Sequence, residues 1–403
     1  MTAALLTDHP MLQTTGLKEV FAAVEAAGGE ARIVGGAVRN ALLDEPVHEI
    51  DIATTLEPDA TMAAAAAAGL TAHPTGIDHG TVTIVSENNG FEVTTLRHDV
   101  ETHGRHATVA FTSDWQADAA RRDFTINALY CGLDGDIRDP LNAIQDIFNR
   151  HVRFAGDPDA RIQEDFLRIL RFFRFFAQYG QGAPDEAGLA ACRRHRAGLN
   201  QLSRERVGQE IGKLLLARRA SDGIGYMNEA GVSEELFGEM LDADLVARVA
   251  AIDEANGLTA DLPLRLAAAF AMPVDRLADQ LRLSNAQGRA LANLREAMPP
   301  SPALRDNERK VVLYQTGAET FVRAVRLAWA DVGAAPDDGE WLGLVRLAEE
   351  WPLPAIPVTG ADLIAAGLEP GPALGAELAR LEDWWVAGGF TATKEELLDR
   401  LSA

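Results

Sequence analysis

The stretch GGAVRN at residues 35–40 is followed, after eight residues, by EIDIATT at residues 49–55. The apolar run ARIV precedes the glycine pair and predicts a short buried strand, whereas AVRNALLD after it predicts a helix. The second stretch alternates apolar with polar residues, which is typical of a strand. A strand, a glycine turn, a helix and a second strand in this order predict the start of a small α/β unit.

The glycine pair is the first candidate binding feature. Glycine lets the backbone approach a ligand closely, and the N–H groups that begin a helix attract an anion. Gly35 and Gly36 therefore predict a phosphate-binding turn, and Arg39 lies one helical turn further along, where its guanidinium can bond a phosphate. The stretch has neither the GxGxxG pattern nor a GK[ST] ending, and a glycine pair alone is also common in plain strand–helix connections.

Carboxylates on the second stretch form the next candidate. Alternate side chains of a strand share a face, so Glu49 and Asp51 are expected on one side, with Ile50 and Ile52 facing the core. Two carboxylates on a rigid face can hold Mg²⁺, and GFEVTTLR supplies Glu92 as a third, catalytic, carboxylate on a neighbouring strand. The alternative is an edge strand whose acids face water, with Glu92 as a surface residue.

Arginines gather in two later segments, RRDFTINAL at residues 121–129 and EDFLRILRFFR at residues 164–174. In the second segment, arginines recur at every third position and line one flank of a predicted helix, while the apolar residues between them form its core side. The alternative is a helix with ordinary surface ion pairs. The candidate nucleotide-binding side chains in the two segments are Arg122, Asp123, Asn127, Glu164, Asp165, Arg168, Arg171 and Arg174.

Charge is unevenly distributed along the 403 residues. The net charge is −23, which taken globally argues against a nucleic-acid partner. Residues 150–219 nevertheless contain fourteen Lys and Arg against eight Asp and Glu, a local net charge of +6. This segment is compatible with binding a phosphate backbone, although the arginines could instead simply solvate helices.

Composition excludes several classes of protein. The two cysteines, Cys131 and Cys192, lie far apart, which argues against a zinc site and a disulfide framework. The start of the chain lacks the pattern of a secretory signal, and no window of about 20 apolar residues predicts a membrane span. We therefore expect a cytoplasmic protein with no membrane contact, and nothing in the sequence implies a stable protein partner.

Taken together, the motifs resemble those of the class II nucleotidyltransferases, the family of CCA-adding enzymes and bacterial poly(A) polymerases. GGAVRN with EIDIAT is similar to the family's GGxVRD turn and DxD strand, and RRDFTINAL matches its next motif. EDFLRILRFFRF is similar to the nucleotide-reading helix, and ERVGQE at residues 205–210 to the ERxxxE helix. The similarity covers roughly residues 30–215, and TGADLIAAGLEPGPALG resembles the tail of bacterial tRNA nucleotidyltransferases.

The resemblance implies an α+β fold, in which a small polymerase-beta-like head with a mixed sheet precedes an all-α neck, body and tail. It places the catalytic head at residues 1–140, the neck at 141–219, the RNA-binding body at 220–350 and the tRNA-binding tail at 351–403. The implied partners are tRNA, ATP and CTP, and the implied cofactor is Mg²⁺.

The resemblance also implies residue roles. Gly36 and Arg39 contact the triphosphate, Glu49 and Asp51 hold Mg²⁺, and Asp165 with Arg168 reads the base edge of CTP or ATP. Two positions depart from the family pattern. Glu49 stands where the family has an aspartate, one methylene shorter, and Asn40 replaces the aspartate of GGxVRD.

The expected activity is template-independent addition of C, C and A to a tRNA 3′ end with release of pyrophosphate. Poly(A) synthesis, or addition of only CC or only A, is the nearest alternative. Poly(A) enzymes of the family tend to carry a basic C-terminal extension, whereas this chain ends in the acidic EELLDRLSA. A non-catalytic RNA-binding protein is the alternative from another class.

Overall fold

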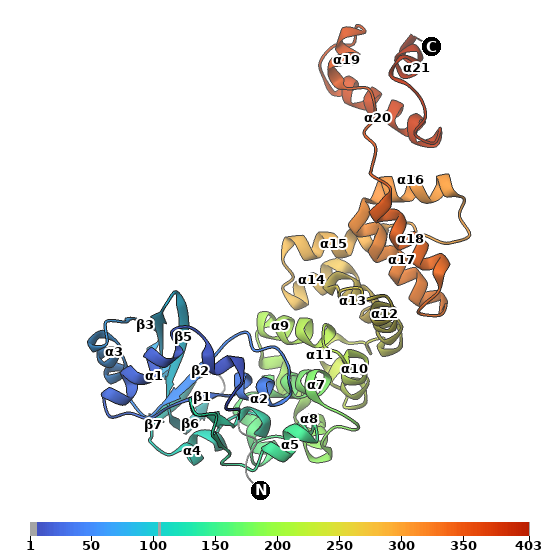
Figure 1. Cartoon of the computed structure of the whole chain (residues 1–403). Helices are drawn as coiled ribbons and strands as arrows, with labels where there is room; N and C mark the ends of the chain where they lie inside the picture. The colour runs from blue at the N-terminus through green and yellow to red at the C-terminus, as the bar shows by residue number, and fades with distance from the viewer. Residues whose placement is uncertain (1–5, 104–105, 403) are drawn as a thin grey trace. The chain divides into compact units, whose positions relative to one another are not determined.

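The computed structural model describes residues 6–103 and 106–402, and it divides into two compact units, Met1–Leu241 and Asp242–Ala403. The first unit combines a β-sheet with helices, and the second unit is helical throughout its described residues (Figure 1). This confirms the predicted fold class. The finer division into head, neck, body and tail stays a prediction. Among the described helices, none has the length and apolarity that crossing a membrane requires.

The first unit is built around a mixed seven-stranded sheet with the order β3-β4-β5-β2-β1-β8-β9. Neighbouring strands are antiparallel except for β2 and β5, which run parallel, and β6 and β7 pair in a separate hairpin. The strands are β1 Ala31–Val34, β2 Asp51–Thr54, β3 Thr71–Gly76, β4 Thr81–Ser86, β5 Asn89–Thr95, β6 Arg97–His103, β7 His106–Phe111, β8 Tyr130–Cys131 and β9 Ile137–Arg138.

Strand β2 begins later than the sequence predicted. The strand pattern included Glu49, but β2 starts at Asp51, which pairs with Val34, the last residue of β1. The chain turns away from the sheet at Gly35, where φ is +72°, so residues before Asp51 have no partner on β1. Glu49 therefore lies in the segment that leads into the strand, and Ile50 is only half-buried, not inward-facing as predicted.

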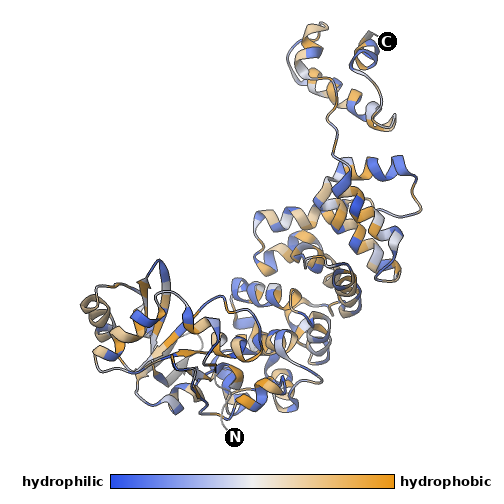
Figure 2. Ribbon diagram, in the orientation of Figure 1, coloured by the Kyte–Doolittle hydropathy of each residue, from blue (hydrophilic) through white to orange (hydrophobic). Residues whose placement is uncertain are grey.

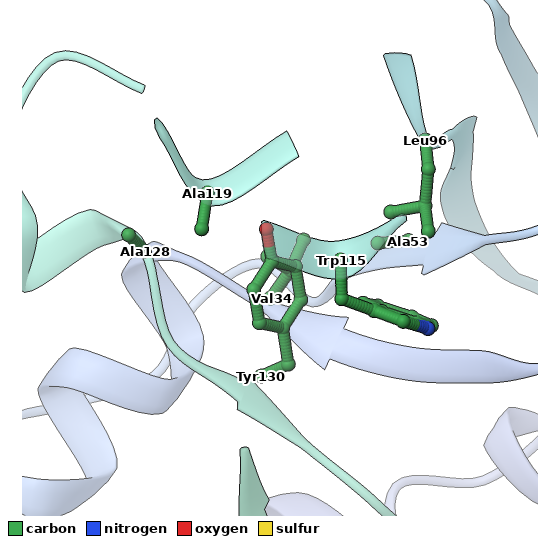
Figure 3. Close-up of a cluster of buried hydrophobic side chains, with 7 residues drawn as sticks. All are labelled: Val34, Ala53, Leu96, Trp115, Ala119, Ala128 and Tyr130. Carbon is green, nitrogen blue, oxygen red and sulfur yellow. The ribbon is translucent and has the colours of Figure 1, made fainter. Parts of the chain in front are cut away.

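The core beneath β1 and β2 is closed by aromatic side chains (Figure 3). Trp115 and Tyr130 pack edge to face with ring centroids 4.9 Å apart, a favourable arrangement for aromatic pairs. The remaining members of the cluster are Val34, Ala53, Leu96, Ala119 and Ala128. Through Tyr130, this core reaches the polar residues of the site described below.

Helices cover the sheet and continue beyond it in the first unit. They are α1 Leu17–Ala26, α2 Gly36–Leu42, α3 Pro58–Ala67, α4 Trp115–Ala120, α5 Ile144–Phe148, α6 Pro158–Glu164, α7 Leu167–Tyr179, α8 Glu186–His195, α9 Arg204–Leu215, α10 Ala220–Glu229 and α11 Val232–Phe237. Short 3₁₀ turns lie at Pro10–Gln13, Ile77–His79, Thr125–Asn127 and Arg196–Gln201. Figure 2 shows apolar residues along the sheet strands and polar residues interspersed along the helices.

An aromatic cluster joins the sheet part of the unit to α7. Phe124 forms an isolated β-bridge with Phe154, and their ring centroids are 5.0 Å apart. Phe154 in turn stacks on Phe172 of α7 at 5.4 Å. All three side chains are fully buried, and burying an aromatic ring contributes about 2–3 kcal/mol. The cluster therefore holds α7, which carries the arginine-rich motif, against residues 123–127 of the RRDFTINAL motif.

The second unit consists of α12 Ala243–Asn256, α13 Leu262–Ala269, α14 Val274–Leu281, α15 Asn285–Glu296, α16 Asp306–Thr316, α17 Ala318–Val332, α18 Gly339–Glu350, α19 Gly360–Ala365, α20 Pro372–Ala387 and α21 Lys394–Asp399. A 3₁₀ turn, Arg400–Ser402, follows. Inside this unit, Asp253 accepts hydrogen bonds from the buried guanidinium groups of Arg265 and Arg326. Because removing one partner of a buried charge cluster leaves the others unpaired, this group ties α12, α13 and α17 together.

Candidate functional site

The glycine turn between β1 and α2 faces an arginine from another segment. The Gly35 N–H donates to the carbonyl of Leu129 at 3.1 Å, which fixes the turn against the end of the RRDFTINAL segment. A Cβ atom added at Gly35 would lie 3.6 Å from Nη1 of Arg122. The positive φ of Gly35 disfavours any side chain there. The structure thus brings the predicted phosphate turn and Arg122 together.

Arg122 is held in this place by an aspartate that the sequence analysis did not single out. Asp118 on α4 has only 1% of its surface exposed, and it accepts hydrogen bonds from Arg122 at 2.9 Å, Arg121 at 2.6 Å and the Tyr130 hydroxyl at 2.7 Å. Burial alone would raise the pKa of Asp118, but Arg122 and Arg121 outweigh it and lower the pKa to about 2. Asp118 is therefore ionised and orients both arginines.

The predicted metal-binding carboxylates lie on β2 and β5. Asp51 and Glu92 are directly opposite each other in the parallel register, and both are solvent-accessible. Desolvation by the surrounding protein raises the pKa of Asp51, the negative charges of Glu92 and Glu49 raise it further, and Arg122 opposes them. The raised pKa indicates that Asp51 lies in a locally negative field that a cation would relieve.

These carboxylates do not form a closed metal cluster. Within the part of the chain that the structure describes, no three His, Cys, Asp or Glu side chains gather closely enough to hold a metal ion. The oxygen donors present suit a hard cation, which commonly takes its remaining ligands from water and substrate phosphates. The oxygen donors of Asp51 and Glu49 fit an open Mg²⁺ site, and their role as metal ligands stays a prediction.

Arg39 has a different environment from the one its motif suggested. Its side chain is buried, with 6% exposed, and its guanidinium donates to Asn127 Oδ1, to the Tyr179 hydroxyl at 2.8 Å and to Asn40 Oδ1 at 2.9 Å. Its guanidinium carbon also lies 4.1 Å from the Tyr179 ring centroid. Each terminal nitrogen is thus engaged within the protein. Direct contact of Arg39 with a triphosphate stays a prediction, and the contacts described indicate that it braces α2 against α7.

Three further predicted residues form an ionic chain between the RRDFTINAL segment and α7. Arg171 donates to Asp123 at 2.7 Å, and Asp123 also accepts a hydrogen bond from Asn127 at 2.9 Å. Burial would raise the pKa of Asp123, but Arg171 and Asn127 keep it below its usual value. Arg174 donates to the buried carboxylate of Glu210 on α9 at 2.5 Å. These contacts hold α7 against the RRDFTINAL segment and against α9.

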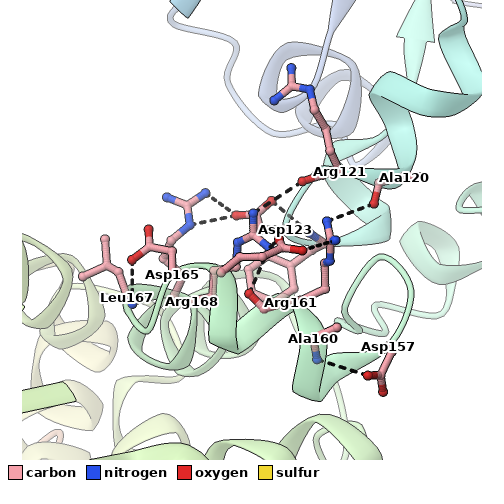
Figure 4. Close-up of polar contacts among 12 residues, drawn as sticks. Ala120, Arg121, Asp123, Asp157, Ala160, Arg161, Asp165, Leu167 and Arg168 are labelled. Atoms are coloured by element: carbon pink, nitrogen blue, oxygen red, sulfur yellow. Dashed lines mark hydrogen bonds and ion pairs between the residues drawn. The ribbon is translucent and has the colours of Figure 1, made fainter. Parts of the chain in front are cut away.

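The two side chains predicted to read a base lie where α6 meets α7: Asp165 is in the turn between the helices, and Arg168 is in the first turn of α7. Figure 4 shows this region beside the end of α4. Arg168 donates to the carbonyl of Arg161 at 3.0 Å and to the Glu164 carboxylate at 2.6 Å. Arg161 also donates to Glu164, and it reaches across to the carbonyl of Ala120 at 3.3 Å. Arg168 is therefore held in one orientation by an acid and by backbone carbonyls.

Asp165 is oriented from two sides. One oxygen accepts from the backbone N–H of Leu167 at 3.1 Å, and the other accepts from Arg206 of α9 at 2.6 Å. An ionised carboxylate has about four acceptor positions, so two remain after these bonds. Asp165 can thus accept a hydrogen bond from a base while it stays anchored to α9.

Contacts in the first unit link many of the predicted site residues: Gly35 faces Arg122, Arg39 donates to Asn127, and Arg171 donates to Asp123. The charges of Glu49, Glu92 and Arg122 act on Asp51.

The sequence patterns did not single out Asp118, Arg161 and Tyr179, and Arg206 and Glu210 stood out only as parts of the ERVGQE motif. Asp118 lies four residues before Arg122, and Arg161 three before Glu164, so helical spacing was an available signal for both. Tyr179 gave no local signal, because its partner Arg39 lies 140 residues away.

Comparison with protein families gives matches in three parts of the chain. A model described as poly A polymerase head domain matches residues 31–153. A model described as probable RNA and SrmB-binding site of polymerase A matches residues 183–244, and one described as tRNA nucleotidyltransferase domain 2, putative, matches residues 268–401.

Similar proteins are aligned over nearly their whole length. The CCA tRNA nucleotidyltransferase 1, mitochondrial, of Danio rerio is 34% identical, and the alignment covers 96% of this chain and 90% of that protein. The CCA-adding enzyme of Latilactobacillus sakei is 31% identical over 93% of this chain and 94% of that protein. Among solved structures, the CCA-adding enzyme of Bacillus stearothermophilus in complex with CTP matches with a TM-score of 0.78 and 27% identity, covering 95% of each chain.

Proposed function

The chain belongs to the family of CCA-adding tRNA nucleotidyltransferases, and we propose that it completes tRNA 3′ ends by adding C, C and A from CTP and ATP. The observation that carries the proposal is the position of Asp165 and Arg168. Both are immobilised by protein partners, and Arg161 ties their turn to α4, the helix that holds Arg122 at the glycine turn.

Base selection follows from the hydrogen-bonding pattern of these two side chains. A carboxylate only accepts and a guanidinium only donates. Cytosine and adenine both present an exocyclic amine, which can donate to Asp165, and a ring nitrogen, which can accept from Arg168. Uracil and guanine present a carbonyl oxygen where the amine stands and would oppose a carboxylate. The proposed site thus accepts CTP and ATP and rejects UTP and GTP without a nucleic-acid template.

The triphosphate is proposed to lie along the glycine turn. Gly35 and Gly36 allow the phosphates to approach the backbone, and Arg122 supplies a charge-assisted hydrogen bond. Arg171 is proposed to extend the nucleotide site along α7, with Arg174 behind it; in the unliganded protein Arg171 is paired with Asp123, and Arg174 is buried and paired with Glu210. Asp118 and Asp123 act through these arginines, as positioning residues.

Asp51, with Glu49, is proposed to hold Mg²⁺ beside the triphosphate, with Glu92 maintaining the negative field around them. Asp51 and Glu49 would hold two Mg²⁺ ions, which would supply activation of an attacking hydroxyl and stabilisation of the leaving pyrophosphate. The tRNA 3′-hydroxyl attacks the α-phosphate of the bound nucleotide, one phosphodiester bond forms, and the bond to pyrophosphate breaks. Glu49 is one methylene longer than the aspartate usual in the family, a difference its position before the strand can accommodate.

The second unit is proposed to hold the tRNA body. Its match to a tRNA nucleotidyltransferase domain supports this role, and the net acidity of the chain favours a few local phosphate contacts over a long basic track. The cytoplasm stays the predicted compartment, although the Danio rerio relative is named mitochondrial.

Labelled-nucleotide incorporation tests the proposal directly. A tRNA transcript that ends at its discriminator base should gain C, C and A in the presence of Mg²⁺, CTP and ATP. Long adenosine tracts on unstructured RNA would favour the poly(A) alternative instead. No incorporation on any RNA, from a folded protein that binds tRNA, would favour the non-catalytic alternative.

A further inference from the structure

The basic segment at residues 150–219 is largely neutralised inside the protein. Arg193 pairs with Glu229, Arg194 with Asp159, Arg206 with Asp165 and Arg219 with Asp222, and the arginines of α6 and α7 pair as described above. An arginine that is already paired has less to gain from a phosphate, because it must first give up a carboxylate. The net charge of this segment therefore does not show where a polyanion would bind.

Two cations of the segment differ from the others. Among the described residues of the first unit, Lys213 and Arg218 are the basic side chains for which no ion pair or hydrogen bond occurs, and both are exposed. They flank the C-terminal end of α9, with Leu216 between them. Leu216 is 43% exposed, so it offers apolar surface at the end of the helix. Two unpaired cations around an apolar side chain form a surface that we call the α9 end surface.

The position of this surface relates it to the proposed site. Arg206, Glu210 and Lys213 follow each other at helical spacing on one side of α9. Arg206 contacts Asp165 and Glu210 contacts Arg174, so this side of the helix faces the nucleotide site. Lys213 lies seven residues beyond Arg206, about 10 Å along the helix axis. At about 3.4 Å per nucleotide, this distance corresponds to roughly three nucleotides of a stacked strand.

We propose that the α9 end surface binds the phosphate backbone of the RNA substrate close to its reactive 3′ end, with Lys213 and Arg218 each contacting a phosphate. The inference rests on the proposed function, since it assumes that an RNA end enters the site. A nucleic acid fits this surface because it offers phosphates beside the apolar faces of ribose and base, which Leu216 can contact. The α9 end surface lies inside residues 183–244, which match a model described as probable RNA and SrmB-binding site of polymerase A.

A helix-stabilising role for Lys213 is the competing explanation, because a cation in the last turn of a helix interacts favourably with its dipole. The two explanations differ in what they predict for RNA. A phosphate contact contributes to affinity for tRNA and to its salt dependence, whereas a contact with the helix dipole contributes only to stability.

The test compares Lys213→Gln, Arg218→Gln and the double variant with Arg194→Gln, which removes the same charge from an exposed arginine that is paired with Asp159. The dissociation constant for a tRNA transcript lacking its 3′ CCA is measured by fluorescence anisotropy between low and high salt. Each single α9 variant should weaken binding about two- to fivefold. Each should also lower the salt slope by roughly 0.7–0.9. The KM for CTP at saturating tRNA should stay at the wild-type value.

Arg194→Gln should leave the salt slope and the affinity for tRNA close to wild type. If the α9 variants behave like Arg194→Gln in both measurements, the inference is wrong. If they lower only the melting temperature, the helix-stabilising explanation holds in its place.

A second RNA localises the contact. Replacing the last three phosphodiester linkages of the transcript by uncharged methylphosphonates should weaken binding of the wild type but add little to the loss in the double variant. If the losses of affinity from the uncharged linkages and from the double variant add up, the α9 end surface does not contact these phosphates and the inference is wrong. Wild-type incorporation on the unmodified transcript is measured in parallel, so that failure of the proposed function is recognised separately from failure of this one.

Discussion

Replacing Asp118 by Asn should both destabilise the first unit and weaken nucleotide binding, because this carboxylate supports the core and the site at once. It is buried, accepts from Arg121, Arg122 and Tyr130, and has a pKa lowered from 3.8 to about 2. At about 1.4 kcal/mol per pH unit, this difference corresponds to about 2 kcal/mol of stability at neutral pH. In a unit of this size, such a loss lowers the melting temperature by about 4–8 °C.

The stabilisation by Asp118 should decrease as the pH is lowered. A carboxylate whose pKa is lower in the folded state stabilises the protein above its unfolded pKa of 3.8 and loses that stabilisation as pH falls towards about 2. Urea unfolding at pH values between 7 and 2 should therefore show the difference in stability between wild type and Asp118→Asn shrinking below about pH 4. Asp78→Asn is the matched control, because Asp78 is an exposed aspartate of the same unit.

The functional part of the prediction acts through Arg122. Without the carboxylate, this arginine is no longer fixed beside Gly35, and the KM for CTP should rise roughly tenfold, the equivalent of one charge-assisted hydrogen bond. Tyr130→Phe removes only one of the bonds to Asp118, and its effect should be less than additive with Asp118→Asn. If Asp118→Asn has the same melting temperature as Asp78→Asn and the wild-type KM for CTP, the role assigned to Asp118 is wrong.

Asp51→Ala should abolish nucleotide incorporation while thermal melting stays that of a folded protein, and substantial remaining activity would exclude β2 as the metal-binding strand. Because the pKa of Asp51 is raised, the Mg²⁺ concentration needed for half-maximal activity should begin to increase at a higher pH than it would for an ordinary aspartate. Asp165→Ala should let UTP and GTP compete with CTP and ATP, and Arg206→Ala should reduce selectivity among the nucleotides to a smaller extent. If both variants discriminate as the wild type does, the turn that carries Asp165 has only a structural role. Finally, tRNA should gain three nucleotides and no more, as measured by product length on a sequencing gel. A chain ending before Pro357 should be impaired in using tRNA or in stopping after three additions more than in binding the nucleotide.

Several parts of the fold and site could be predicted from the sequence because they depend on local patterns. Strands β1 and β5 and helix α2 follow from apolar runs, alternation and glycine positions, all of which act over a few residues. The order of the motifs likewise indicated the family, since each motif is contiguous. The predicted start of β2 was wrong for a non-local reason. Because β1 ends at Val34, the residues before Asp51 have no partner on β1.

Tertiary structure decided what each charged side chain does. The sequence alone does not distinguish the roles of four cations. Arg39 belongs to the glycine-turn motif, and the basic segment at residues 150–219 contains Arg171, Arg206 and Lys213. In the folded chain, Arg39 is engaged by Tyr179, Arg171 by Asp123 and Arg206 by Asp165, whereas Lys213 has no such partner among the described residues. These partners lie 41 to 140 residues apart in sequence, so no local pattern encodes them. Secondary structure is set by neighbours along the chain, but the availability of a charge for a ligand is set by which distant groups packing brings within hydrogen-bonding distance.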